Sequence, residues 1–229
     1  SPQHLRGLDF TDSTHGWVVG DSGTILKTTN GGVEWRSVDG GTDATLAAVD
    51  FVDDSNGWAV GEGGVVLKSA DGGATWGTQR ASEVDLRDLD FVDLANGWAV
   101  GDDGTVIGTS DGGVTWSVQT SPTTVALNGI DFVDPENGWA VGDTGTILHT
   151  LNGGLEWVDQ TSRIAGSLLG AGFADKKSGW AVGAKGVLLH TSNGGTRWDR
   201  YESITNHDIR AINVLDEFSA FATGDRGLV

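Results

Sequence analysis

Carboxylates, histidines and one tyrosine are the side chains through which this 229-residue chain could do acid–base or nucleophilic chemistry. A glycosidase needs two carboxylates about 5–10 Å apart across a cleft, but among 32 acidic residues chance pairs are certain. Most of them recur at turns, where an aspartate side chain accepts bonds from neighbouring backbone N–H groups. The carboxylates therefore give no specific sign of catalysis. One recurring set is Asp12, Asp53, Asp93, Asp134, Asp175 and Asp216.

The histidines show no metal-ligand spacing and no serine–histidine–aspartate pattern. His149 and His190 hold the repeat position that Lys27 and Lys68 hold elsewhere, so we interpret them as ordinary strand residues. The chain has no cysteine, which excludes disulfides and thiolate zinc sites. We predict no catalytic residue, no metal site and no cofactor, with calcium at the aspartate-rich corners left open as an alternative. The remaining histidines are His4, His15 and His207.

A tandem repeat positions all of these residues, and the tryptophans reveal it. Two series of five recur with steps of 40 or 41 residues, and together they contain all ten tryptophans of the chain. A tryptophan buries on the order of 150–250 Å², so we expect these side chains to form the core and not exposed platforms for sugars. The series are Trp17, Trp58, Trp98, Trp139 and Trp180, and Trp35, Trp76, Trp116, Trp157 and Trp198.

Each repeat contains four short β-prone segments separated by Asp, Asn and Gly corners. Alternating apolar residues and glycine-rich breaks favour strands over helices. Four strands in 40–45 residues are typical of a propeller blade, whose faces are buried only by stacking on neighbouring blades. We therefore predict an all-β chain, a β-propeller of four-stranded blades. The expected blades are about residues 5–44, 45–84, 85–124, 125–166 and 167–206, with a partial sixth at 207–229.

The corner between the third and fourth segments carries a motif, as in Ser69-Ala70-Asp71-Gly72-Gly73-Ala74-Thr75-Trp76. It resembles the Asp-box, Ser/Thr-x-Asp/Asn-x-Gly-x-x-Trp, and it occurs five times in register. The resemblance implies a structural role, on the rim away from the functional face. The matching residues are Asn30, Asp71, Asp111, Asn152 and Asn193, followed by Trp35, Trp76, Trp116, Trp157 and Trp198.

A longer phrase, Gly-Trp-Ala-Val-Gly-Asp-Thr-Gly-Thr-Ile-Leu at residues 138–148, is more selective. It resembles the photosystem II assembly-factor type of Asp-box propeller over nearly the whole chain. The resemblance implies a ring of seven blades. Because the sixth copy stops inside its third strand, we expect residues 1–229 to be a single propeller domain and a fragment of the longer ring. A six-bladed ring closed by a partner is the alternative.

The charge distribution is uneven. The net charge of −18 argues against nucleic acid or an anionic membrane as partner, and no apolar run reaches the roughly 18–20 residues of a membrane helix. Residues 170–229 nevertheless hold 7 basic and 7 acidic side chains, half of all the lysine and arginine. This sector is either a docking surface or a solvated surface on which the charges have drifted without a function. Its cations are Lys176, Lys177, Lys185, Arg197, Arg200, Arg210 and Arg226.

Three arginines depart from their repeat equivalents. Arg6, Arg87 and Arg210 each stand three residues before the Asp or Asn of the first strand, where other copies have Ala, Asn or Leu. We expect them at the mouth of the central channel of the propeller, where an arginine can form two hydrogen bonds to a carboxylate of a partner. The alternative is that each pairs with an acidic corner of its own blade, such as Asp21 or Asp225.

These observations predict a non-catalytic scaffold that binds protein, as an assembly or stability factor or accessory subunit of a larger complex. That the complex is photosynthetic is implied by the resemblance alone. A membrane-complex subunit is the expected partner class, without insertion into the membrane, and an extracytoplasmic location is expected, whether periplasmic, lumenal or secreted. The alternative is a carbohydrate-active or carbohydrate-binding Asp-box propeller of the sialidase or glycosidase kind. That resemblance implies a tyrosine nucleophile, but Tyr201, which is the single tyrosine, follows an Asp-box tryptophan on an outermost strand.

Overall fold

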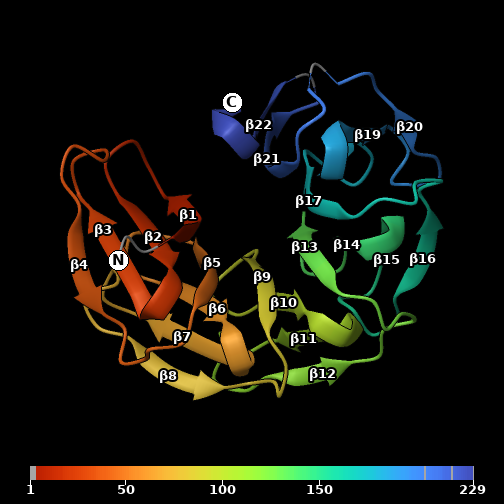
Figure 1. Ribbon diagram of the computed structural model, residues 1–229. Helices are drawn as coiled ribbons and strands as arrows, with labels where there is room; N and C mark the ends of the chain where they lie inside the picture. The colour runs from red at the N-terminus through yellow and green to blue at the C-terminus, as the bar shows by residue number, and fades with distance from the viewer. Residues whose placement is uncertain (1–3, 204, 218, 229) are drawn as a thin grey trace. The chain divides into compact units, whose positions relative to one another are not determined.

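The computed structural model describes residues 4–203, 205–217 and 219–228. Within these ranges the chain forms five antiparallel sheets of four strands and one of two strands (Figure 1). Each four-stranded sheet keeps its strands in sequence order, and we call each sheet a blade and its strands A to D. The predicted all-β architecture of propeller blades, five complete and a sixth in part, is confirmed.

The strand bounds follow the repeat. Blade one has β1 (Leu5–Phe10), β2 (Gly16–Gly20), β3 (Thr24–Thr28) and β4 (Arg36–Asp39). Blade two has β5 (Leu46–Phe51), β6 (Gly57–Gly61), β7 (Val65–Ser69) and β8 (Gly77–Arg80). Blade three has β9 (Leu86–Phe91), β10 (Gly97–Gly101), β11 (Val106–Thr109) and β12 (Ser117–Gln119). Blade four has β13 (Leu127–Phe132), β14 (Gly138–Gly142), β15 (Thr146–Thr150) and β16 (Val158–Thr161).

Blade five has β17 (Leu168–Phe173), β18 (Gly179–Gly183), β19 (Val187–Thr191) and β20 (Asp199–Arg200), and blade six has β21 (Ile209–Asp216) and β22 (Ser219–Gly224). A three-residue 3-10 turn follows strand B in every blade. These turns are η1 (Asp21–Gly23), η2 (Glu62–Gly64), η3 (Asp102–Gly104), η4 (Asp143–Gly145), η5 (Ala184–Gly186) and η6 (Asp225–Gly227). Among the described residues, no helix is long and apolar enough to cross a membrane.

The chain divides into two compact units. The first contains residues up to Gly101 and Ile107–Val118, and the second contains Asp102–Val106 and the residues from Gln119 onward. In the first unit β1, β5 and β9 are successive neighbours, and in the second β13, β17 and β21 are. Strand A of one blade therefore lies beside strand A of the next within each unit. That residues 1–229 form one propeller domain stays a prediction.

Aromatic stacks join successive blades. The ring of Trp17 in blade one lies 3.6 Å from that of Phe51 in blade two, nearly parallel, and Phe51 meets Trp76 edge-on at 5.7 Å. The same arrangement surrounds Phe91 and Phe173. Six of the ten tryptophans are buried and the other four are half-buried. This burial agrees with the core role predicted from their spacing.

The glycine before each strand-B tryptophan is required because a ring lies against it. A Cβ on Gly97 would stand 2.4 Å from the ring of Phe91, with which Gly97 pairs across the strands. Blade six shows the converse, because Val214 takes the place of the phenylalanine and pairs with Ala220 in place of the glycine. The smaller side chain leaves space for the methyl group.

A carboxylate on strand A links a blade to the next in blades one, two and four. Asp9 accepts the backbone N–H of Phe51 at 2.9 Å, and Asp50 accepts that of Phe91 at 2.8 Å. Burial raises the pKa of Asp9. Burial, together with the neighbouring Asp90 and Asp9, raises the pKa of Asp50 well above its usual range. The inner strands thus carry carboxylates that favour the protonated form more than exposed ones do.

Glutamines on strand D make a second link between blades. Gln160 of blade four donates through Nε2 to Gly194 O at 2.9 Å and accepts the indole N–H of Trp198 at 3.3 Å. Gln119 makes the same two bonds to blade four. In blade one Val38 holds this position, and the buried indole nitrogen of Trp76 has no hydrogen-bond partner among the described residues.

Candidate partner-binding site

The predicted arginines are the bulged residues of strand A. In blade one Leu5 pairs with Gly20 and Gly7 with Val19, which leaves Arg6 as the extra residue of a β-bulge. Arg87 and Arg210 occupy the same bulge in blades three and six. A bulge takes one residue out of the regular ladder and re-aims its side chain. This position is therefore free of the core, which explains why its residue type varies between blades.

The bulged side chain bonds the 3-10 turn of its own blade. Arg6 Nε donates to Asp21 Oδ1 at 2.7 Å, and Arg210 Nε donates to Asp225 Oδ1 at 2.6 Å. These hydrogen bonds lower the pKa of Asp21 and of Asp225. For Arg6 and Arg210 the structure thus shows the alternative considered from the sequence, a local ion pair. Their side chains are still 50% and 60% exposed.

The two positions change together in blades four and five but not in blade two, where the bulge has Ala47 and the turn keeps Glu62. In blade four Asn128 Nδ2 donates to Asp143 Oδ1 at 3.1 Å. In blade five Leu169 and Ala184 stand at the two positions, so the polar partners are lost together. In blades one, four and six a hydrogen bond therefore joins the bulge to the turn. Because Arg6 and Arg87 belong to the first unit and Arg210 to the second, their convergence on one partner stays a prediction.

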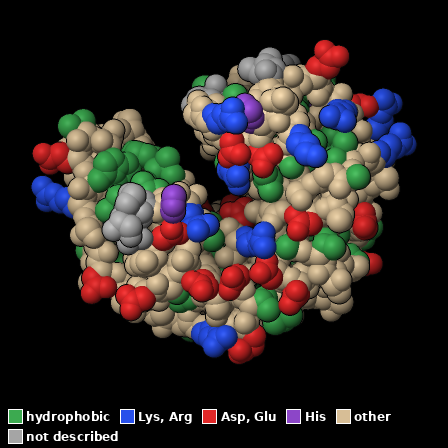
Figure 2. Space-filling model, in the orientation of Figure 1, with side chains coloured by type: hydrophobic (Ala, Val, Ile, Leu, Met, Phe, Trp, Pro, Cys, Tyr) green, Lys and Arg blue, Asp and Glu red, His purple; other side chains and the backbone are tan. Residues whose placement is uncertain are grey.

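The other cations of the predicted docking sector separate into two groups. Lys176 Nζ lies 2.7 Å from Asp134 Oδ2 of the preceding blade, and Arg197 Nη2 lies 2.6 Å from Asp199 Oδ1. Figure 2 shows that lysine and arginine side chains gather on the part of the second unit that contains β17–β20. Within the described ranges, no carboxylate forms an ion pair with the second group, which is Lys177, Lys185, Arg200 and Arg226.

The Asp-box residues bond their own corners. In blade two Ser69 Oγ and the Thr75 backbone N–H donate to Asp71 Oδ1 at 2.9 and 2.8 Å. The hydroxyl and N–H of Thr75, followed by the Ser69 hydroxyl, lower the pKa of Asp71 to about 2. Gly72 N–H donates to Ser55 O in the A–B corner at 2.8 Å. The same backbone bond to the box residue recurs at Asn30, Asp111, Asn152 and Asn193.

Strand-C residues cover the outer faces of the strand-B tryptophans. Lys27 Nζ lies 5.6 Å from the Trp17 ring centroid, and the imidazole of His149 stacks on Trp139 at 4.5 Å. Burial lowers the pKa of His149, so a neutral ring is favoured there. Packing on tryptophan gives these strand residues a structural role, which the spacing alone did not reveal. Lys68 over Trp58 and His190 over Trp180 repeat the arrangement.

Tyr201 occupies the strand-D position at which blades two to four have glutamine. Its ring packs 5.1 Å from Trp180 and 5.7 Å from His190, and 48% of the residue is exposed. Among the described residues, no side chain hydrogen-bonds to its hydroxyl. Packing on Trp180 and His190 therefore accounts for this tyrosine.

Asp12, His15 and Asp54 bring three potential metal ligands within 4.8 Å of one another. The spacing in sequence did not predict this cluster, because Asp54 comes from the next blade. His15 stands where blade two has Asn56, and its backbone N–H donates to Asp12 Oδ1 at 2.8 Å as Asn56 does to Asp53. The cluster is thus a variant of the recurring A–B turn, with an imidazole in place of an amide.

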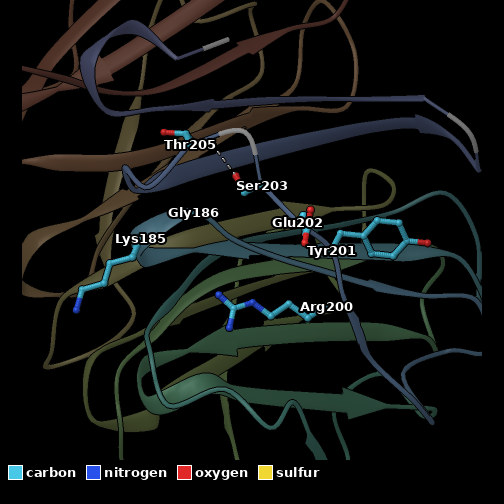
Figure 3. Close-up of a pocket in the computed structure, with 7 residues that line it drawn as sticks. All are labelled: Lys185, Gly186, Arg200, Tyr201, Glu202, Ser203 and Thr205. Atoms are coloured by element: carbon cyan, nitrogen blue, oxygen red, sulfur yellow. Dashed lines mark hydrogen bonds between the residues drawn. The ribbon is translucent and has the colours of Figure 1, made fainter.

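A pocket of about 440 Å³ lies on blade five, in the second unit. Figure 3 shows Lys185 from η5 and Arg200 from β20 extending to the same side, whereas Tyr201 points the other way. These two cations are 15 residues apart, and only the pairing of strands C and D brings them to one place. The other lining residues are Gly186, Glu202, Ser203 and Thr205.

Comparisons with known proteins identify the family. The model of the family described as photosynthesis system II assembly factor YCF48 matches residues 2–83, 78–162 and 118–207. A search of curated protein sequences finds no match. Among solved structures, YCF48 from Cyanidioschyzon merolae is 19% identical over 98% of this chain and 94% of its own, with a TM-score of 0.63.

Two further structures share the fold. YCF48 bound to D1 peptide is 19% identical over 98% of this chain and 91% of its own, with a TM-score of 0.56. An ancestral GH74 enzyme is 13% identical over 97% of this chain but only 35% of its own, with a TM-score of 0.77. At such identities the structures show the fold alone. The family match, which spans most of the sequence, shows that this chain belongs to the photosystem II assembly factor YCF48 family.

Proposed function

We propose that this chain is a non-catalytic propeller that binds a protein partner during the assembly or stabilisation of a larger complex. The observation that carries the proposal is membership of the YCF48 assembly-factor family over residues 2–207. The side chains with catalytic potential support it, because the structure accounts for them otherwise. The single tyrosine packs on Trp180, and two histidines cover tryptophans.

The partner is a polypeptide of a membrane complex, which the chain meets from an extracytoplasmic compartment without entering the membrane. YCF48 has been seen with a D1 peptide bound, and that structure suggests the scale of the ligand, a peptide segment. The net charge of −18 disfavours nucleic acid. We place the contact on the cationic positions, with residues 1–229 as one propeller domain. Arg6, Arg87 and Arg210 are its first group, and the cations of blades five and six are its second.

Affinity capture tests the proposal. The tagged chain is incubated with detergent-solubilised membranes of the source organism, and the bound proteins are identified and quantified. We expect recovery of a stoichiometric protein partner, and weaker recovery with Arg87→Glu or Arg210→Glu. Because Arg210 holds Asp225, thermal unfolding of each variant is measured in parallel. Arg36→Glu is the matched control, since Arg36 is exposed and forms only a 4.0 Å ion pair on outer strand D.

Two outcomes contradict the proposal. Absence of a protein partner, together with binding to a glycan array or hydrolysis of a polysaccharide, would favour the carbohydrate-active alternative. Equal recovery by the arginine variants and the wild type would remove the bulge positions from the contact, while the assembly role would stand.

A further inference from the structure

We propose that the Lys185–Arg200 pocket of blade five binds a carboxylate in an acidic segment of the protein partner. This inference rests on the proposed function and names a site within it. The pocket lies wholly in the second unit, between η5, β20 and the loop from strand D to blade six. Lys185 comes from η5 and Arg200 from β20, and Figure 3 shows both side chains extending to the same side.

The first observation is that these cations lack the partners that others have. Every described lysine and arginine of the first unit has a polar or aromatic partner. In the described part of the second unit, neither Lys185 nor Arg200 forms an ion pair. Glu202 also lines the pocket but forms an ion pair with neither cation among the described residues. Lys185 and Arg200 repel one another, and an incoming carboxylate between them relieves that repulsion. The charges thus favour an anion as occupant.

The second observation is that blade five is unlike its equivalents at this place. Blade four has Thr144 at the middle of its 3-10 turn and Asp159 on strand D, where blade five has Lys185 and Arg200. In blade five the turn also begins with Ala184, whereas the turns of the other blades begin with aspartate or glutamate. The fold therefore requires neither cation, and the acidic residue that would neutralise them is missing from this turn.

The third observation is that the backbone fixes the pocket. Lys185 has a left-handed φ of 56°, and its N–H donates to Asp208 Oδ1 at 2.9 Å. The carbonyl of Thr205 lies so close to Gly186 that a Cβ there would stand 2.1 Å from it. The same loop presents Ser203, whose hydroxyl oxygen accepts the Thr205 N–H at 3.3 Å and so keeps its own proton for a ligand. An ammonium, a guanidinium and a hydroxyl together suit a carboxylate.

An acidic polypeptide fits the charges better than a free small anion. The whole chain carries −18, so its long-range field repels anions. Exposed charges are largely screened beyond about 10 Å at 0.1 M salt, and the local cations then decide the contact. A peptide adds contacts along the open pocket that a single inorganic anion does not make. Glu202 at the pocket edge disfavours a second carboxylate close to the first.

Fluorescence anisotropy tests the site on the whole chain. The probe is a fluorescein-labelled octapeptide of alternating Glu and Gly, and its partner peptide has Gln in place of Glu. The test variant is Lys185→Asn with Arg200→Gln, because asparagine tolerates the left-handed backbone. The matched control is Arg163→Asn with Arg36→Gln, because neither residue belongs to the proposed contact and Arg36 is exposed on blade one. It removes the same charge outside the pocket, and Arg163 also has a left-handed φ, of 61°.

We expect the wild type and the control to bind the Glu peptide within twofold of each other. We expect the test variant to bind at least tenfold more weakly, which corresponds to about 1.4 kcal/mol, and the Gln peptide to bind no variant. Thermal unfolding within about 2 °C of the wild type shows that the variant folds. If the variant is less stable, Arg200→Gln alone is used, since strand D is exposed there.

Three results would overturn the proposal. They are unchanged affinity in the test variant, an equal loss in the control, and binding of inorganic phosphate with no difference between the two peptides. The last result would make the pocket a small-anion site. Capture of the membrane-complex partner by the same pocket variant separates the two proposals. If the pocket variant captures the partner as well as the wild type does, the pocket proposal is wrong and the assembly role stands.

Discussion

Truncation of Phe91 gives a quantitative test of the blade-to-blade stacks. Phe91 is 5% exposed, stacks on Trp58 at 3.7 Å and meets Trp116 edge-on at 5.8 Å. Its repeat equivalent Phe10 is 39% exposed and, among the described residues, has only the edge contact with Trp35, at 5.9 Å. Both lie in the first unit. Phe10→Ala is therefore a matched control for Phe91→Ala.

The difference between the two follows from buried area. A phenylalanine of roughly 200 Å² buries about 190 Å² at 5% exposure and about 120 Å² at 39% exposure. The difference of about 70 Å² is worth about 1.7 kcal/mol at 25 cal/mol per Å². The parallel stack adds about 0.5–1.5 kcal/mol. We expect Phe91→Ala to lower the free energy of unfolding by about 3–5 kcal/mol, and Phe10→Ala by about 2–3 kcal/mol less.

The assay is urea unfolding followed by tryptophan fluorescence and by circular dichroism. In a chain of this length about 4 kcal/mol corresponds to a fall in Tm of roughly 10 °C. Coincident transitions by the two probes show that a single free energy describes unfolding. An equal loss in the two variants, or a loss below about 2 kcal/mol for Phe91→Ala, would refute the account of stacks as the main link between blades.

Three further changes test other parts of the fold. Asp50→Asn should raise the free energy of unfolding at pH 7, because burial raises the pKa of the folded carboxyl and makes its ionisation unfavourable. The stability that the protonated Asp50 contributes is present at low pH and is lost as pH rises through the folded pKa, whereas asparagine stays neutral at every pH. Urea titrations from pH 4 to 8 should show this gain shrinking toward pH 4, and destabilisation at pH 7 would contradict it. Gly97→Ala should lower the free energy of unfolding by about 1–3 kcal/mol, because the added methyl group meets the ring of Phe91. In a Phe91→Val background most of that loss should disappear, and an unchanged loss would show that the backbone at Gly97, not the ring, is the cause. Gln160→Ala should lower the free energy of unfolding by about 2 kcal/mol, since it leaves the Trp198 indole N–H without an acceptor and the Gly194 carbonyl without this donor; in a Trp198→Phe background, which has no indole N–H, the loss should be smaller, and an unchanged loss would show that the bond to Trp198 is not the cause.

The repeat made the blades predictable. A blade needs apolar residues at fixed places on four short strands, and a period of 40 or 41 residues displays those places directly. The Asp-box corners were predictable for the same reason, since their bonds are local. Asp71 bonds Ser69 and Thr75, all within seven residues.

The candidate site was predictable only in part. The sequence indicated that Arg6 and Arg210 depart from their equivalents and offered pairing with an acidic corner as one explanation. The bulge that sets these positions apart depends on the pairing of strands A and B, which a repeat pattern does not show. Charge counting likewise pointed to blades five and six, but it did not separate Lys176, which pairs with Asp134, from Lys185, which does not.

By itself the sequence determined the period, the strands, the Asp-box corners and the family resemblance, because each depends on residues close together in the chain. The tertiary structure decided which glycines must stay small, which histidines serve as packing surfaces, and which cations keep their charge available. Those properties depend on how strands and blades are placed, as where the ring of Phe91 lies against Gly97 or where Lys185 and Arg200 line one pocket. Such contacts join residues whose separation along the chain carries no signal of its own, and only the paired strands bring them together.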